Sequence, residues 1–373
     1  MIPVCSPDTT EVEKRWVNKA LDENRISSTA GFTEEFEEKF AEKIGVKYAI
    51  SCNSGGSALF LALWALGIRQ GDEVIVPTFT MFATANAVIQ CGAKPVFMDS
   101  EYETGNINAW NIKEKITERT KAIIPVHIYG HPCDMKTLRT IARVNKLFIV
   151  EDAAEAHGAI HKTITYAGWE NGINTTVDEF TGSMGDIGCF SFYANKIITT
   201  GEGGMVTTNN EELAKEIRAL RQYDMVHNTH FWHTKMSWNL RLSSLQAAYG
   251  LGQLERWDEL IQKRRNNATF YTEKLKGVVT TPTEMPYAKS VYWMYFIKTP
   301  WRNELEEYLK NNGIETRRSF TPLHWMPPFK EDTKYPIADR LEQEGLYLPS
   351  GSNLSEKDRN FVIKKVLDFF SEK

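Results

Sequence analysis

Long apolar runs and an excess of one charge sign are both missing from this sequence of 373 residues. No apolar stretch approaches the roughly 20 residues that a membrane-spanning helix needs. The formal net charge is only −4, so no basic footprint for nucleic acid is present. The first residues lack the basic-then-apolar order of a signal peptide. We therefore expect a cytoplasmic protein that binds neither membranes nor nucleic acid.

Cysteine is scarce, and its positions are scattered. The five residues are Cys5, Cys52, Cys91, Cys133 and Cys189. Disulfide frameworks usually show an even number of cysteines, and metal sites show closely spaced pairs. Neither pattern is present, so we expect free thiols and no metal site. A G-x-G-x-x-G motif after the first strand is also missing, which argues against a Rossmann oxidoreductase.

An alternation of strand-like and helix-like segments fills the first half of the chain. The apolar strand-like segments are 48–50, 73–77, 94–99, 122–126 and 147–152. The helix-like segments between them are 58–66, 81–91, 111–116 and 135–145. This order predicts an α/β fold with a mostly parallel sheet and helices on both faces. In such folds, ligands bind beyond the carboxyl ends of the strands.

The chain is long enough for about two domains. We expect an N-terminal segment at 1–30, a large α/β domain at 31–250 and a smaller α+β domain at 251–373. Residues 160–184 interrupt the rhythm, and Asn171 and Gly172 among them indicate a loop or a hairpin. A long helix is predicted over 243–263, and an aromatic-rich strand over 291–298.

Lys196 is the strongest candidate for a reactive group. An apolar strand-like run, FSFYAN at 190–195, delivers it into a turn, and the glycines of GEGG at 201–204 follow. Poor solvation lowers the pKa of an amine, and only the neutral amine attacks a carbonyl to form a Schiff base. A single lysine beside a strand is more often an ordinary surface residue, so Lys196 needs support from other segments.

Two further segments supply that support. The turn around Gly55 and Gly56 precedes a helix, where free backbone N–H groups and the helix dipole form a seat for phosphate. Asp152 lies at the end of a strand, where a buried carboxylate requires a cationic partner. A protonated pyridine nitrogen is one such partner, and a structural salt bridge is the alternative. A phosphate seat, a carboxylate and a lysine match the needs of pyridoxal 5'-phosphate (PLP).

With these residues the chain resembles the DegT/DnrJ/EryC1/StrS family of sugar-nucleotide aminotransferases over nearly its whole length. The motifs that carry the resemblance are GDEVIVPTFT at 71–80, PVHIYG at 125–130, EDAAEAHG at 151–158, GDIGCFSF at 185–192, NKIITTGEGG at 195–204 and WNLRL at 238–242. The resemblance implies the PLP-dependent fold type I, aspartate aminotransferase-like, with a seven-stranded, mostly parallel sheet in the large domain.

The resemblance also implies a role for each matching residue. Lys196 forms the Schiff base with PLP and shuttles the proton, and pyridoxamine phosphate is the form between the two half-reactions. The other implied cofactor contacts are Asp152 to the pyridine nitrogen, Glu155 near the ring hydroxyl, and Gly55, Gly56 and Ser191 to the phosphate. Asn239 is implied to reach the phosphate of the partner subunit, so a homodimer with shared active sites is expected.

Three features depart from the family pattern. Gly56 stands where the family often has threonine, so one hydroxyl contact to phosphate is absent. Met81 stands where an aromatic residue usually stacks on the cofactor ring, and a thioether covers less of that ring. The stretch between Gly158 and Gly185 is longer than usual. It is either a tolerated surface insertion or a loop that covers the substrate or extends the dimer contact.

Within the family, the resemblance is strongest to enzymes that aminate C4 of GDP-linked 4-keto-6-deoxymannose with L-glutamate as amino donor. The substrate candidates that we name are Ser27, Ser28, Trp293, Arg317 and His324, each of which could equally be a core or surface residue. Arg317 and His324 suit anionic oxygens. The alternatives are a dTDP- or UDP-linked keto sugar aminated at C4 or C3, and a PLP-binding sensor without turnover. The resemblance also includes dehydratases, which carry histidine at the position of Lys196. The lysine of this chain therefore argues against dehydration and for transamination.

Overall fold

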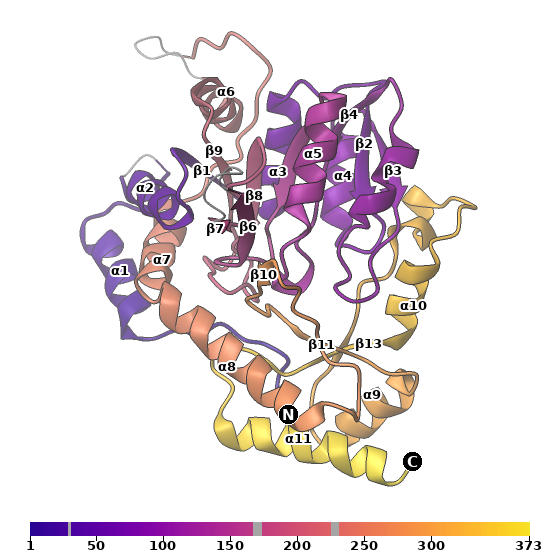
Figure 1. Ribbon diagram of the computed structural model, residues 1–373. Helices are drawn as coiled ribbons and strands as arrows, with labels where there is room; N and C mark the ends of the chain where they lie inside the picture. The colour runs from indigo at the N-terminus through magenta and orange to yellow at the C-terminus, as the bar shows by residue number, and fades with distance from the viewer. Residues whose placement is uncertain (29–30, 167–173, 225–230) are drawn as a thin grey trace.

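A seven-stranded sheet runs through the computed structural model, which describes residues 1–28, 31–166, 174–224 and 231–373 (Figure 1). The strand order is β1-β9-β8-β5-β4-β2-β3. The strands are β1 (Tyr48–Cys52), β2 (Glu73–Pro77), β3 (Lys94–Met98), β4 (Thr120–Ile123), β5 (Phe148–Asp152), β8 (Ile187–Ser191) and β9 (Gly204–Thr208). Only β9 runs antiparallel to its neighbours, β1 and β8. The prediction of a mostly parallel sheet is therefore confirmed.

Helices cover both faces of this sheet, because its strands are apolar on both sides. In β5, Ile149 packs in the core under α5, whereas Val150 packs in the larger core that holds α3 and α4. The covering elements are α3 (Gly55–Ala65), α4 (Phe82–Gln90), α5 (Met135–Asn145), α6 (Glu211–Arg221) and the 3-10 helix η1 (Ala109–Lys115). Helix α3 begins three residues earlier than the sequence suggested, and this places both Gly55 and Gly56 in its first turn.

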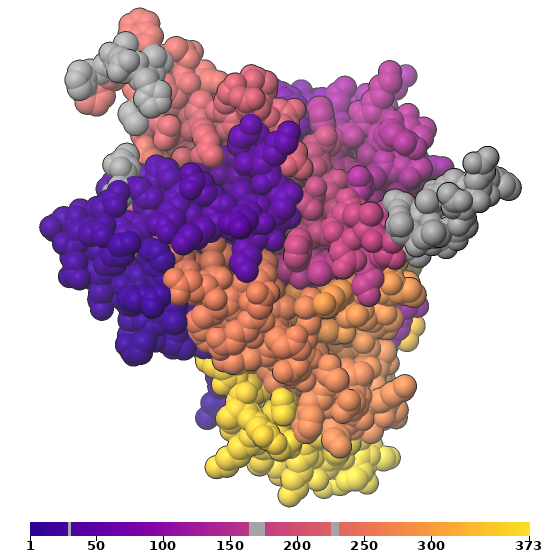
Figure 2. All heavy atoms as spheres, turned by 60° about the vertical axis from the view of Figure 1, so that its left-hand side comes forward, coloured from indigo at the N-terminus to yellow at the C-terminus, as the bar shows by residue number. Residues whose placement is uncertain are grey.

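The N-terminal helices α1 (Glu11–Asp22) and α2 (Phe32–Ile44) pack against α7 (Ser244–Glu255). Figure 2 shows this N-terminal region and the α7–α8 region as one continuous surface. The single helix predicted over 243–263 is wrong, because α7 ends and α8 (Trp257–Leu275) begins around Arg256. The Arg256 guanidinium at this break bonds to Asp8 and Glu13. These ion pairs hold the N-terminal segment against the junction of α7 and α8. The predicted domain boundary at residue 250 falls within α7, and the division into domains stays a prediction.

A second sheet of three antiparallel strands forms in the C-terminal part of the chain, in the order β11-β13-β12. Its elements and their neighbours are β11 (Tyr295–Lys298), β12 (Arg317–Arg318), β13 (Gly345–Leu348), α9 (Arg302–Asn311), α10 (Pro336–Glu344), α11 (Glu356–Ser371) and the 3-10 helices η3 (Leu323–Trp325) and η4 (Pro327–Phe329). The strand predicted from residue 291 begins only at Tyr295. Tyr292 has φ +48°, a left-handed conformation that a strand cannot contain.

A hairpin interrupts the alternating order, as residues 160–184 suggested. It consists of β6 (Ile160–Tyr166) and β7 (Asn174–Phe180), and β6 also pairs with β10 (Ala288–Lys289). The turn residues Asn171 and Gly172 lie outside the described residues. Among the described helices, none is both long and apolar enough to cross a membrane.

The first residues of the chain lie beside its C-terminal part (Figure 1). Ile2 forms a parallel bridge with Ile314, in which Ile2 N–H donates to Gly313 C=O over 2.8 Å. Two residues later, the Val4 carbonyl accepts a hydrogen bond from Ser350 N–H (3.0 Å). The first residues are thus hydrogen-bonded to segments from the C-terminal part of the sequence.

Candidate active site

Lys196 lies in the loop that leaves β8, and its side chain is only 11% exposed. The loop is closed by a hydrogen bond from Phe192 N–H to the Gly203 carbonyl (2.8 Å). The Lys196 Nζ lies 3.8 Å from Glu155 Oε1 and 3.8 Å from the centre of the Trp293 ring. The turn predicted from the sequence therefore delivers a buried amine between a carboxyl group and an aromatic face.

Burial acts on both ionisable groups of this pair. It lowers the pKa of Lys196, which the nearby charges of Glu155 and Asp152 partly oppose. It raises the pKa of Glu155, which the charge of Lys196 partly opposes. A low dielectric disfavours the charged form of each group, and this favours a neutral amine at Lys196. A neutral amine is the form that reacts with carbonyl compounds.

Asp152 ends β5 at the carboxyl edge of the sheet and is 4% exposed. Its Oδ2 accepts a hydrogen bond from Thr84 Oγ1 (2.8 Å), and its Oδ1 accepts one from Ala154 N–H (3.2 Å). Burial raises the pKa of this carboxyl. In the described ranges of the chain, no ion pair joins Asp152 to a cation. A buried carboxylate without a cationic partner is costly, so the site is suited to a ligand that brings a positive charge.

Glu151, the neighbour of Asp152, has a different environment because strand residues alternate between faces. Its carboxylate accepts three backbone N–H bonds from the loop 182–185 and contacts His127 Nε2 at 3.0 Å. The His127 Nδ1 accepts a bond from Cys133 N–H (3.0 Å), which places the ring proton on Nε2. Glu151 is therefore fully bonded within the protein and holds the loop that precedes β8.

The turn before α3 presents backbone N–H groups that are free to donate hydrogen bonds. Ser54 caps the helix by accepting a hydrogen bond from Ser57 N–H, while the N–H groups of Gly55 and Gly56 have no intrahelical partner. The backbone at Gly55 passes so close to Ser191 that an added Cβ would lie 2.7 Å from the Ser191 Cβ. An added Cβ at Gly56 would meet nothing nearer than 3.8 Å. The structure thus brings Gly55 and Ser191 together, and it leaves room for a larger side chain at Gly56.

Tyr129 is a residue of this region that the sequence analysis did not single out. It has φ +55°, and its N–H donates to Glu155 Oε2 (2.8 Å). Its carbonyl accepts a bond from Trp293 N–H (2.8 Å), and its ring stacks on Phe320 at 5.4 Å. Tyr129 therefore fixes the partners of Lys196 and joins the large sheet to the C-terminal elements. The sequence signal that could have identified Tyr129 as a site residue is its position in the PVHIYG motif.

Thr84 is a second residue that sequence reasoning missed. It lies in α4, one turn after Met81, and its hydroxyl reaches Asp152 from a separate element. Nothing in the local sequence marks this threonine, because the contact depends on how α4 packs on the sheet. Met81 itself is 53% exposed, and its Sδ accepts a hydrogen bond from Ala83 N–H (2.9 Å). The role predicted for Met81 stays a prediction.

Asn239 has an exposed side chain and lies close to the turn before α3. The next residue, Leu240, accepts a hydrogen bond from Asn53 N–H (2.9 Å) in the same chain. The predicted contact of Asn239 with the phosphate of a partner subunit stays a prediction. Ser27 is exposed and Ser28 is partly exposed, and their carbonyls accept hydrogen bonds from Ser244 and Thr33.

The three remaining candidates have distinct surroundings. Trp293 is 5% exposed, and its indole N–H donates to the Asn195 carbonyl (2.8 Å), which fixes the ring against Lys196. His324 is also buried, and its nitrogens lie 2.8 Å from Thr78 Oγ1 and 3.1 Å from Asp339 Oδ1. Arg317 is exposed on β12. Of the three, only Trp293 contacts the amine of Lys196.

Comparison with known proteins gives three consistent matches. The model of the DegT/DnrJ/EryC1/StrS aminotransferase family matches residues 7–367. GDP-perosamine synthase of Escherichia coli O157:H7 is 40% identical, with 100% of this chain and 99% of that protein aligned. GDP-perosamine synthase of Caulobacter vibrioides is 42% identical over 97% of this chain and 96% of that protein.

A solved structure extends this likeness to three dimensions. The PLP-form of Spr1654 from Streptococcus pneumoniae superposes with a TM-score of 0.91 and 26% identity, covering 99% of this chain and 98% of that one. The fold is therefore the fold type I architecture predicted from the sequence. The family match and this neighbour point to dependence on PLP.

Proposed function

The chain belongs to the DegT/DnrJ/EryC1/StrS aminotransferase family, and on this basis we propose that it converts GDP-4-keto-6-deoxy-D-mannose to GDP-perosamine. L-glutamate is the proposed amino donor and PLP the proposed cofactor. The observation that carries the proposal is the buried Lys196 amine, held 3.8 Å from the Glu155 carboxyl group. The likeness to two GDP-perosamine synthases, at 40% and 42% identity, supports the choice of substrate.

The residues present fit PLP on two independent grounds. Asp152 is a buried carboxylate whose described surroundings contain no ion-pair partner, and it would hold the pyridine nitrogen of the cofactor in its protonated form. Gly55 and Gly56 offer unpaired helix N–H groups, and with the Ser191 hydroxyl they would hold the phosphate. When bound, the cofactor supplies an electron sink that stabilises negative charge on the substrate carbon.

The protein's own contribution to the reaction is to place and move a proton. Burial lowers the pKa of the Lys196 amine and favours its neutral form, which can accept a proton and return it to the reacting carbon. Burial raises the pKa of Glu155, so this carboxyl group can hold a proton 3.8 Å from Nζ. The Trp293 ring covers one side of Nζ.

The first experiment identifies the substrate. The purified protein is incubated with PLP, L-glutamate and a panel of GDP-, dTDP- and UDP-linked 4-keto and 3-keto sugars, and mass spectrometry detects the product that gains an amine. We expect amination of GDP-4-keto-6-deoxy-D-mannose. Reaction with only a dTDP- or UDP-linked sugar would overturn the GDP assignment and retain the aminotransferase class.

A second experiment separates an aminotransferase from a sensor that binds PLP without turnover. Lys196→Ala is expected to abolish transamination while the far-UV circular dichroism stays unchanged. Borohydride treatment of the unaltered protein should attach the cofactor covalently, and peptide mass mapping should place the attachment at Lys196. Lys298→Ala is a suitable control, because Lys298 is also buried but bonds to the Tyr102 carbonyl away from this cluster. Turnover by Lys196→Ala at the normal rate would refute the proposed role.

A further inference from the structure

A cavity of about 560 Å³ lies on the outer side of α5, bordered by η1, β6 and the segment before β10. None of its lining residues belongs to the cluster around Lys196. Its volume is in the range of small-molecule sites in proteins, which is roughly 300–1,000 Å³. Whatever binds there is therefore held apart from the proposed reaction.

The cavity has aromatic walls. Trp110 lines it from η1 and is 73% exposed. Tyr287 lines it from the segment before β10, and its ring stacks on His161 at 5.2 Å with an interplanar angle of 29°. An exposed indole beside a second ring suits a planar aromatic ligand, because stacking would remove its face from water.

Positive charge surrounds these rings. Lys113 of η1, Lys136 of α5 and Lys162 of β6 all line the cavity. The acidic residue that lines it, Asp134, caps α5 by accepting hydrogen bonds from Thr137 N–H (3.1 Å) and Thr137 Oγ1 (2.7 Å). Lys113 and Lys162 outnumber this one carboxylate, which is already bonded, and they therefore favour an anionic ligand.

His161 gives an independent indication that a polar ligand binds here. It lines the cavity and is only 1% exposed. Its Nδ1 pairs with Thr163 Oγ1 (3.1 Å), whereas its Nε2 has no hydrogen-bond partner among the described residues. Buried polar nitrogens are nearly always bonded in native proteins, and this unpaired nitrogen belongs to a residue in the wall of the cavity.

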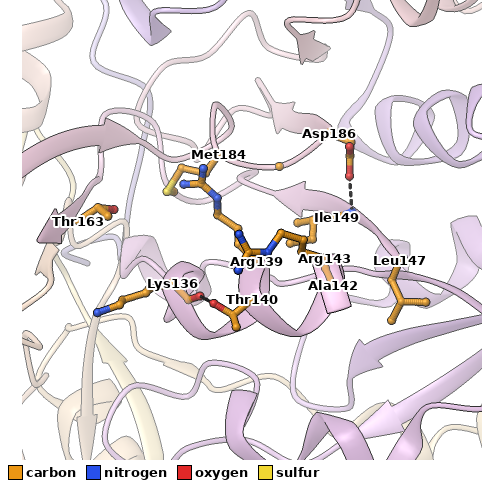
Figure 3. A pocket seen from close by; sticks show the side chains of 11 residues that line it. Lys136, Arg139, Thr140, Ala142, Arg143, Leu147, Ile149, Thr163, Met184 and Asp186 are labelled. Atoms are coloured by element: carbon orange, nitrogen blue, oxygen red, sulfur yellow. Dashed lines mark hydrogen bonds between the residues drawn. The ribbon is translucent and has the colours of Figure 1, made fainter. Parts of the chain in front are cut away.

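A second hollow lies on an adjacent face of α5 and shares Lys136 and Thr140 with the first, but the rest of its lining differs (Figure 3). It measures about 500 Å³ and is lined by Arg139 and Arg143. Arg139 is paired with Glu179 (3.0 Å), and Asp186 accepts a hydrogen bond from Ile149 N–H (2.8 Å). No aromatic residue lines it. The combination of rings, lysines and an unpartnered histidine is therefore particular to the first cavity.

We propose that the cavity between Trp110, Tyr287 and His161 binds a nucleoside diphosphate at a site separate from the active site. The base stacks on the exposed indole of Trp110. The phosphates lie between Lys113 and Lys162, where ammonium groups act as point charges for phosphate oxygens. The His161 Nε2 completes its hydrogen bonding with the ligand.

Isothermal titration calorimetry of the PLP-loaded, full-length protein with GDP tests this proposal. The double variant Trp110→Ala/Lys113→Ala is compared with the unaltered protein and with Trp301→Ala, which removes another exposed tryptophan outside the cavity. We expect the double variant to bind one GDP fewer per chain, or to bind it at least tenfold more weakly. Trp301→Ala should match the unaltered protein. Transamination without added GDP should be equal in all three.

Two outcomes would overturn the proposal. The first is equal GDP stoichiometry and affinity in the double variant and in the unaltered protein. The second is binding of inorganic pyrophosphate at this site as tightly as GDP, which would exclude a contribution from the base. Because the test compares the number of GDP molecules bound with and without the cavity residues, it does not depend on the identity of the sugar nucleotide that reacts at Lys196.

Discussion

Asp152 and Glu151 are adjacent carboxylates whose surroundings separate their functions. Glu151 has its acceptor capacity filled by backbone N–H groups and His127, whereas Asp152 has one hydroxyl and one backbone donor. The Thr84 hydroxyl holds Oδ2 of Asp152 and leaves acceptor capacity on Oδ1. We regard Thr84 as a positioning residue for the carboxylate that would hold the cofactor.

The first prediction concerns this hydroxyl. Thr84→Val preserves the shape of the side chain and removes the donor to Asp152, and a hydrogen bond to a charged group contributes roughly 1.5–3 kcal/mol. We expect PLP affinity, measured by absorbance titration of the apoprotein, to fall by about tenfold or more. Thr80→Val is the control, because Thr80 contacts Thr84 at 3.4 Å without a bond to Asp152. Unchanged PLP affinity in Thr84→Val would contradict this role.

The second prediction concerns His157, which is fully buried between Phe190 and Phe192. Burial lowers its pKa from 6.5 to about 3. The unfolded chain therefore takes up a proton on this histidine as pH falls below 6.5, and the folded chain does so only near pH 3. Protonation of the unfolded state alone lowers the free energy of unfolding, so this contribution is present above pH 6.5 and is lost as pH falls toward 3.

Urea unfolding at pH 7 and pH 5 and at one fixed protein concentration measures this effect. The loss of stability between the two pH values should be smaller in His157→Phe than in the unaltered protein, by about 2 kcal/mol. His233→Phe, at an exposed histidine, should leave the loss unchanged. Equal losses in His157→Phe and the unaltered protein would show that His157 is not the group responsible.

The roles of single residues were predictable where local sequence determines the environment. Lys196 follows an apolar strand, so its burial could be expected from the sequence. Thr84 and Tyr129 could not be identified as partners of Asp152 and Glu155, because these contacts join elements that are distant in the chain. The surroundings of His324 were also hidden, since Thr78 and Asp339 come from two other segments.

At the level of elements, the first turn of α3 gives the sharpest contrast between two neighbouring glycines. A methyl group at Gly55 would lie 2.7 Å from the Ser191 side chain, whereas one at Gly56 has free space. Gly55→Ala should therefore displace the turn, lower stability and weaken PLP binding. Gly56→Ala should raise stability by about 0.5–1 kcal/mol, because it removes glycine freedom from the unfolded chain without strain.

Chemical unfolding and PLP titration of the two alanine variants, made side by side, check this prediction. Each variant serves as the control for the other, since both add one methyl group to the same helix turn. Destabilisation of equal size in both variants would contradict the geometry described.

Elements were predictable to different degrees for physical reasons. β2 and α5 follow from their apolar patterns and clear boundaries, and their observed limits agree with the ranges expected from the sequence. The α7–α8 break was not predictable, because periodicity continues through Arg256 and the interruption comes from distant carboxylates. η1 was expected as an ordinary helix, but residues 109–115 adopt the tighter 3-10 form.

At the scale of the whole molecule, we predict a homodimer in which Asn239 serves the active site of the partner. Lys196→Ala and Asn239→Ala proteins, each weakly active or inactive alone, are mixed after partial unfolding and refolded together. A mixed dimer then contains one site with both natural residues, so activity should reach about one quarter of the unaltered level if the chains pair at random. Activity no higher than the average of the two separate variants would place Asn239 in its own chain's site.

The pairing of Ile2 and Val4 with the far end of the sequence affects biosynthesis. The Val4 N–H bonds to a Glu315 oxygen 311 residues further along the chain. At translation rates of about 5–20 residues per second, residues 2–4 wait on the order of 15 to 60 seconds for these partners to be synthesised. This segment therefore docks late, and until then its backbone N–H and C=O groups lack the partners that they have in the folded chain.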